Sequence, residues 1–263
     1  RQMCIRDSNI YDEGERAYNT TYKYHLTEFG FSDVWYKNLR FGLGLRFEYY
    51  KYKDFLFKKP ELTGLDVESE HFLSYFAQVY YSTFDKGYFP SKGTEFKAAY
   101  SLYTDNMAQY NDHAPFSALS GSWASVVPVT RRFSIIPSIY GRVLIGKDIA
   151  YPLQNAIGGE VYGLYIPQQL PFAGVTNMEL MDNSIMIASV KLRQRMGSIH
   201  YLTLTGNYGL TDSHFFEILK GKQLFGISAG YGMDSMFGPL EITFGYSNQT
   251  DKGSCYVNLG YYF

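Results

Sequence analysis

The chain is poor in cysteine and tryptophan and has no long hydrophobic run. Its 263 residues include only two cysteines, Cys4 and Cys255, which have neither a metal-ligand spacing nor the look of a disulfide framework. No run of about 18 apolar residues is present, which excludes a membrane-spanning helix. The formal net charge is −1, so no nucleic-acid partner is expected. Nothing in the sequence indicates a metal ion or a cofactor.

The start of the chain also lacks the marks of an export signal. Residues 1–8 have no apolar core and no cleavage site of small residues. They look unrelated to the sequence that follows, so we expect residues 1–15 to be a non-native or disordered start. The rest of the pattern is that of an exported protein, and we therefore expect the true amino-terminus to be missing.

Aromatic residues are what the chain has in abundance. They make up 18% of it, with 26 tyrosines and 20 phenylalanines, while the mean hydropathy is only −0.22. These values suit a β-barrel in a membrane, because half of each strand faces water inside the barrel. Tyr and Phe near strand ends are candidates for interfacial anchors.

In the last nine residues, apolar side chains alternate with mostly small or polar ones. One side of the expected strand carries Cys255, Val257, Leu259, Tyr261 and Phe263, and the other carries Tyr256, Asn258, Gly260 and Tyr262. A strand with one apolar face that ends the chain on an aromatic residue is typical of a closed barrel in lipid. A soluble sheet could show the pattern once, so its recurrence decides the interpretation.

The clearest strand runs from residue 39 to 49. Its apolar face consists of Leu39, Phe41, Leu43, Leu45, Phe47 and Tyr49. The opposite face carries Arg40, Arg46 and Glu48, which would be costly in a dry core but are accepted by a watery lumen. The apolar face is therefore expected to point outward to lipid.

Similar strands are expected along the whole chain. We place them at 16–28, 39–49, 71–83, 95–102, 116–127, 133–145, 184–195, 199–208, 224–233, 240–247 and 255–263. In the last five strands, the residues expected to face the lumen are polar or charged and include Lys191, Arg193, Thr203, Thr205, Asn207, Ser228, Glu241 and Thr243. The residues expected to face lipid are apolar and include Met186, Val190, Leu202, Leu204, Phe225, Ile227, Ile242 and Phe244. Pro137 is expected to mark a bulge.

The connections between these strands alternate in length. Long ones are expected at 51–70, 104–115, 147–183, 211–223 and 248–254, and tighter ones at 29–33, 84–94, 128–132, 196–198 and 234–239. Long loops outside and short turns inside are typical of bacterial outer-membrane barrels. Segment 147–183 is too apolar for disorder and could fold back into the barrel. The count of about eleven strands is odd, whereas bacterial barrels are normally even, which again indicates a missing amino-terminal part.

Several of these segments together resemble a known family. The turn Asp85–Thr94, the long loop with Ile157-Gly-Gly-Glu160, the five strands after it and the terminal Tyr261-Tyr-Phe263 resemble the bacterial surface antigen barrel. This is the sixteen-stranded domain of the barrel-assembly and two-partner-secretion superfamily. The stretch from Ile157 to Phe172 is most similar to the version fused to patatin-like phospholipases.

The resemblance implies roles for particular residues. Ile157, Gly158, Gly159 and Glu160 would form the loop tip, and Asp85, Pro90 and Gly93 would belong to a periplasmic turn. Tyr261 and Phe263 would form the signal read by the barrel-assembly machinery. Insertases and transporters of the superfamily usually have an arginine where Gly158 stands, and its absence here favours the phospholipase-fused branch.

No catalytic site is expected in this chain. A patatin-type hydrolase needs Gly-x-Ser-x-Gly, but Gly121-Ser-Trp-Ala-Ser lacks the closing glycine and lies in an expected strand. The five histidines (His25, His71, His113, His200 and His214) are scattered. Ser198 and His200 lie at a tight turn and are candidates for a catalytic pair. Their spacing is better interpreted as that of ordinary turn residues. Glu160 could pair with Lys191 or Arg193, or simply be exposed.

We therefore expect the carboxy-terminal part, residues 16–263, of an all-β, antiparallel transmembrane barrel in the bacterial outer membrane. It would anchor, and help to export, an upstream patatin-like phospholipase domain, with outer-membrane lipids and the barrel-assembly machinery as partners. The alternative is a transporter or insertase of the same superfamily. A soluble β-sandwich or lipid-carrying barrel is a third hypothesis, against which the charged inner face argues.

Overall fold

The fold is known from a computed structural model that describes residues 2–12, 15–57, 70–162, 166–175, 177–236 and 238–260. A twelve-stranded antiparallel sheet dominates it, in the order β1-β2-β3-β4-β5-β6-β7-β11-β12-β13-β14-β15. The strands are β1 (Gln2–Asp12), β2 (Glu15–Tyr36), β3 (Leu39–Phe57), β4 (Glu70–Ser82), β5 (Gly93–Thr104), β6 (Phe116–Pro128), β7 (Phe133–Ile145), β11 (Ser184–Met196), β12 (His200–Asp212), β13 (Lys222–Ser235), β14 (Gly238–Ser247) and β15 (Gly253–Leu259).

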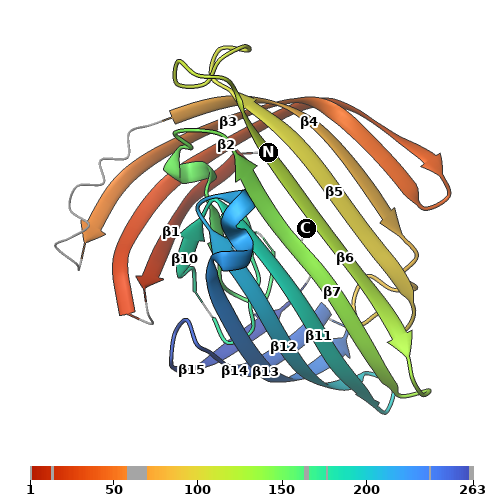
Figure 1. Cartoon of the computed structure of the whole chain (residues 1–263). Coiled ribbons are helices and arrows are strands. Elements are labelled where there is room, and N and C mark those ends of the chain that lie inside the picture. The colour runs from red at the N-terminus through yellow and green to blue at the C-terminus, as the bar shows by residue number, and fades with distance from the viewer. Residues whose placement is uncertain are drawn as a thin grey trace.

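The sheet curves around a smaller unit built from the segment between β7 and β11 (Figure 1). This unit contains the short helix η2 (Tyr151–Leu153) and a three-stranded sheet of β8 (Asn155–Ile157), β9 (Gln169–Leu170) and β10 (Leu180–Asp182). A second short helix, η3 (Phe215–Lys220), lies between β12 and β13. The long segment thus lies inside the curved wall, as expected from the sequence. In the part of the chain that the structure describes, no helix is long and apolar enough to cross a membrane.

The two faces of the wall differ as the alternation predicts. On β12, Leu202 and Leu204 are each 44% exposed, whereas the neighbouring Thr205 is 7% exposed on the inner face. Leu43 on β3 and Phe244 on β14 also point outward, while Glu48 is buried within the wall. In water so much exposed apolar surface would cause aggregation, whereas in lipid it is solvated. The expected all-β, antiparallel barrel wall is confirmed.

The structure corrects the expectations for the first 60 residues. Residues 1–15 were expected to be unrelated or disordered, yet Gln2–Asp12 forms β1 and pairs with β2, which makes twelve wall strands instead of about eleven. The turn expected at 29–33 lies inside β2, and the chain turns at residues 37–38. Gly30 faces Gly44 across the two strands, and a side chain at Gly30 would strike the carbonyl of Leu43.

Two further differences are smaller. β3 continues to Phe57, so the loop expected from residue 51 starts later, and residues 58–69 lie outside the described part. Pro137 does not mark a bulge, because its partner is Val190 and the register with β11 continues on both sides. The last strand is described only as far as Leu259, and the three terminal residues lie outside the described part.

Candidate functional site

The candidate site is the lumen, where the segment between β7 and β11 packs against the inner wall. Leu153, Ala156 and Ile157 are completely buried in this segment, and Phe172 is 1% exposed. Ile157 and Phe172 pack with Tyr140, Ile185 and other wall residues in one apolar cluster. The segment, named the lumen loop below (residues 147–183), therefore packs as a plug against the wall, with which it shares an apolar core.

The tip of the lumen loop is built from close backbone contacts. The amide of Gly158 donates to the carbonyl of Leu170 at 3.0 Å, and the amide of Gly159 donates to Val175 at 2.7 Å. A Cβ atom on Gly158 would lie 1.9 Å from the carbonyl oxygen of Asn177. Position 158 therefore has no room for an arginine side chain. Because residue 158 has no side chain, the backbone of the loop tip can pack against Leu170 and Asn177 of the same loop.

Glycines in the loop and in the wall let the two backbones touch. Gly174 has a left-handed φ of 82°, and a Cβ atom there would lie 2.3 Å from the carbonyl carbon of Tyr246 in β14. A Cβ on Gly226 in β13 would lie 2.2 Å from the carbonyl oxygen of Ala173, and one on Gly245 would meet Gly174. These glycines allow the loop to lie directly on β13 and β14.

Polar side chains fix the other side of the loop to β7. The Arg142 guanidinium donates to the carbonyl of Leu153 at 2.8 Å and to the side-chain oxygen of Asn155 at 2.6 Å. Asn155 in turn donates to the carbonyls of Arg142 and Asn183. The Tyr140 hydroxyl donates to the carbonyl of Pro171 at 2.8 Å. Charge-assisted and buried hydrogen bonds of this kind make the attachment specific.

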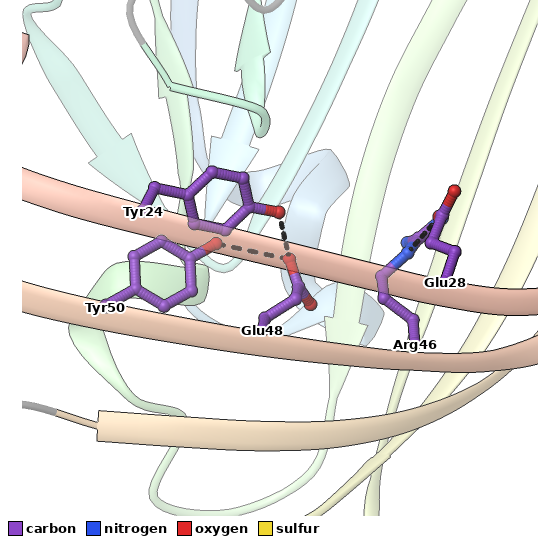
Figure 2. A network of polar contacts seen from close by, with 5 residues as sticks. All are labelled: Tyr24, Glu28, Arg46, Glu48 and Tyr50. Carbon is purple, nitrogen blue, oxygen red and sulfur yellow. Dashed lines mark hydrogen bonds and ion pairs between the residues drawn. The ribbon is translucent and has the colours of Figure 1, made fainter. Parts of the chain in front are cut away.

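A third attachment reaches β2 and β3 through a buried carboxylate (Figure 2). Glu48 is 2% exposed and accepts hydrogen bonds from the hydroxyls of Tyr24 at 2.8 Å and Tyr50 at 3.3 Å. The Gln168 amide of the loop donates to the Tyr50 hydroxyl at 2.9 Å. The sequence pattern placed Glu48 inward, and Tyr50 shares its parity. Contact with Gln168 had no sequence signal, because 118 residues separate it from Tyr50.

Farther along β2 and β3, Arg46 and Glu28 form an ion pair with a shortest distance of 2.6 Å (Figure 2). The Arg46 guanidinium also lies 4.9 Å from the centre of the Phe76 ring. Both charged groups lie on the inner side of the wall, as the sequence predicted for Arg46. A cavity of about 710 Å³ lies beside them and is lined by Arg40, Arg142, Glu48 and Gln168 among others. The lumen therefore keeps polar space in spite of the plug.

Glu160, at the loop tip, binds differently from the expected pairing with Lys191 or Arg193. The Thr243 hydroxyl donates to its carboxylate at 3.3 Å. Burial raises the pKa of Glu160 above its usual value, although Lys191 and the Thr243 hydrogen bond act in the opposite direction. Arg193 is engaged elsewhere, since its guanidinium donates to the carbonyl of Pro90. The loop tip thus faces β14, and Lys191 acts on it only as a nearby charge.

The predicted turn between β4 and β5 is tightly organised. Asp85 accepts hydrogen bonds from the Ser91 amide at 2.7 Å, from the Ser91 hydroxyl and from the Lys92 amide at 3.3 Å. Partial burial acts to raise the pKa of Asp85, but these hydrogen bonds outweigh it and lower that pKa. Gly93 has a φ of 108° and passes so close to Thr83 that a side chain would not fit. These contacts explain the aspartate and the glycine of the turn.

The histidines are not brought together. His200 contacts the Tyr231 hydroxyl at 2.6 Å, and His113 lies 3.2 Å from Asp148, both in exposed settings. Among the described residues, no three His, Cys, Asp or Glu side chains are grouped as metal ligands would be. The segment around Gly121 lies in β6, as expected. Tyr261 and Phe263, the predicted assembly signal, lie outside the described residues.

Comparison with known proteins identifies the family to which the chain belongs. The sequence profile of the OMP85 superfamily matches residues 2–263. This chain belongs to the OMP85 superfamily. The family match begins at residue 2 and so includes the segment that forms β1. No curated protein sequence matches the chain.

Solved structures show the same fold. BamA from Haemophilus ducreyi lacking POTRA domains 1–3 has a TM-score of 0.63 and 12% sequence identity, over 97% of this chain and 56% of that one. CdiB from Escherichia coli has a TM-score of 0.63 and 14% identity, over 91% of this chain and 45% of that one. The chain thus spans about half the length of these structures. As an OMP85 barrel, it is a bacterial outer-membrane protein.

The contact of Gly174 with β14 predicts a sensitive position. Replacing Gly174 by alanine forces a left-handed residue and a backbone clash, so Gly174→Ala should lower the free energy of unfolding by about 1–3 kcal/mol. Urea titration of the folded protein in detergent, followed by tryptophan fluorescence, measures this. Gly206→Ala is the matched control, because no atom lies within 4 Å of its Cβ position. Equal unfolding midpoints for the two variants would contradict the loop contact.

The lowered pKa of Asp85 predicts how the turn responds to acid. A carboxylate with a depressed folded pKa contributes stability above its unfolded pKa of about 3.9 and loses it as the pH falls through the folded value. Amide exchange protection of residues 91–92 should therefore stay constant from neutral pH to about pH 4 and fall only below that. In Asp85→Ala, protection should be low throughout. A loss of wild-type protection beginning well above pH 4 would show that another group controls the turn.

Proposed function

We propose that this chain is the outer-membrane anchor and translocator domain of a patatin-like phospholipase whose catalytic domain lies upstream. The observation that carries the proposal is the loop tip. Gly158 stands where transporters and insertases of the superfamily usually have an arginine, and the contact with Asn177 leaves no space for one. The sequence from Ile157 to Phe172 also resembles the phospholipase-fused branch.

The lumen supports an anchoring role for the barrel. The lumen loop is held to β3, β7, β13 and β14 by hydrogen bonds and by backbone contacts at glycines. A plug fixed at so many points stabilises the wall from within. We propose that the chain itself supplies membrane attachment and that hydrolysis is a property of the upstream domain. Outer-membrane lipids and the barrel-assembly machinery would be its other partners.

A second candidate is a transporter or insertase of the same superfamily. Membership in the OMP85 superfamily supports this alternative. So does the polar space beside the plug, where Arg40, Arg142 and Glu48 line a cavity. In that case the upstream region would consist of periplasmic domains alone.

The coding region upstream of residue 1, and the lipid hydrolysis of the full-length protein, separate the two candidates. For the anchor, the upstream sequence should contain Gly-x-Ser-x-Gly, and outer membranes with the full-length protein should release fatty acids from phospholipid. Alanine in place of that serine should abolish release while leaving the heat-modifiable gel mobility of a folded barrel. An upstream region of periplasmic domains, with no fatty-acid release, would contradict the anchor and favour the transporter.

A further inference from the structure

Two neighbouring short turns carry three exposed arginines at one rim of the wall. Arg131 and Arg132 lie in the turn between β6 and β7, and Arg195 lies at the start of the turn between β11 and β12. The Arg195 amide donates to the carbonyl of Arg132 at 2.7 Å and so joins the two turns. Within the described part of the chain, none of the three guanidinium groups forms an ion pair or lies over a ring. These arginines, named the basic patch, are therefore free to bind an anion.

Hydrogen bonds within the turns hold the basic patch on a fixed backbone. The Thr130 hydroxyl accepts hydrogen bonds from the amides of Phe133 at 3.0 Å and Arg132 at 3.3 Å. The Val129 amide donates to the carbonyl of Phe133 at 3.0 Å. Gly197 has a left-handed φ of 74°, which lets β11 turn tightly into β12. The arginines thus extend from turns whose backbone is already ordered.

The basic patch lies where the lipid-facing side of the wall ends. Short turns of bacterial barrels are periplasmic, so this rim meets the periplasmic leaflet of the membrane. Val129 and Met196, in the same two turns, are 54% and 50% exposed, and Val127 on the outer face of β6 is 48% exposed. Arginines beside exposed apolar side chains are typical of the level at which acyl chains meet headgroups. The surface is therefore continuous with the lipid interface of the wall.

Charge is unevenly divided between the two rims of the wall. Six Lys and Arg residues and only two Asp residues occur at the periplasmic turns, which are 37–38, 84–94, 129–132, 195–199 and 234–239. One of these aspartates, Asp85, is bound within its own turn. The opposite rim has five acidic residues and three lysines in its connections 104–115, 211–223 and 248–254. An anionic ligand is therefore favoured at the periplasmic rim and disfavoured at the other.

A phospholipid satisfies both parts of this surface. Arginine binds phosphate through paired N–H groups, and it is less strongly hydrated than lysine, which suits it to a membrane interface. Acyl chains can cover Val127, Val129 and Met196 while the phosphate meets the guanidinium groups. A free phosphate ion would leave the apolar side chains in water.

We propose that the basic patch binds the phosphate group of an anionic phospholipid in the periplasmic leaflet, whose acyl chains lie along the outer face of β6, β7 and β11. The ligand is held at the junction of two turns, and the barrel itself supplies every contact. The site does not rest on the identity of the upstream domain or on the proposed function.

Native mass spectrometry of the full-length protein, in micelles that contain a diether phosphatidylglycerol, tests the site. Ether-linked chains are used because a phospholipase would hydrolyse esters, so binding is measured apart from the proposed hydrolysis. Each arginine removed should weaken the apparent affinity about fivefold, so Arg195→Gln should lose about fivefold and Arg131→Gln/Arg132→Gln about 25-fold. The triple variant should lose about a hundredfold.

Two other ligands separate the lipid from simpler anions. Diether phosphatidylcholine, which has the same chains and no net charge, should bind the wild type more weakly than the anionic lipid does. Inorganic phosphate at the concentration of the lipid should leave the bound lipid in place, because it cannot replace the acyl-chain contacts. Displacement by inorganic phosphate, or equal binding of the two lipids, would contradict an anionic phospholipid as the ligand.

Lys147→Gln/Lys220→Gln/Lys222→Gln is the matched control for the triple variant, because it removes three positive charges from exposed positions at the opposite rim. It should bind the lipid with wild-type affinity. Heat-modifiable mobility shows which variants are folded, and any folded variant of the basic patch is decisive. Wild-type affinity in those variants would overturn the proposal. An equal loss in the control would also overturn it, because binding would then depend on net charge alone.

Discussion

The structure depends on one constraint: each wall strand meets two different solvents. Lipid offers no hydrogen bonds, so backbone groups must pair with neighbouring strands and outward side chains must be apolar. The inner face meets water and accepts ions. Alternation with a period of two satisfies both conditions, as Leu204 and Thr205 on β12 illustrate. The low mean hydropathy of a membrane protein follows directly, because only half of each strand contributes to the apolar face.

A wet lumen creates a second requirement, which the lumen loop meets. A loop that enters the barrel must pair its own backbone groups, and it does so at Gly158 and Gly159 and through β8, β9 and β10. It must also find a fitting wall. Gly226 and Gly245 let the backbones approach, and Arg142 and Tyr140 supply hydrogen bonds to loop carbonyls. The buried Glu48 is stabilised at one carboxylate oxygen, to which the hydroxyls of Tyr24 and Tyr50 donate.

Much of the wall could be predicted from the sequence, since alternation is a local property. β7 and β11 agree with expectation to within a residue, and inward Lys191 and outward Val190 were placed correctly. The errors arose where a local signal has two meanings. The turn expected at 29–33 falls inside β2, where Gly30 serves the close approach of β2 to β3, and Pro137 reads as a bulge but stays in register. The contacts of the loop with Tyr50 and Thr243 join residues far apart in the chain, for which one sequence holds no signal.

Spin labels attached one at a time to Leu43, Leu204, Phe244, Arg46 and Lys191, in protein without native cysteines and reconstituted in lipid, test the orientation of the wall most directly. Collision rates with oxygen, which is enriched in lipid, and with a water-soluble nickel chelate are measured at each position. The account predicts high oxygen and low nickel accessibility at the first three positions and the reverse at Arg46 and Lys191. The opposite pattern, with apolar positions shielded from lipid and charged positions facing it, would contradict the account.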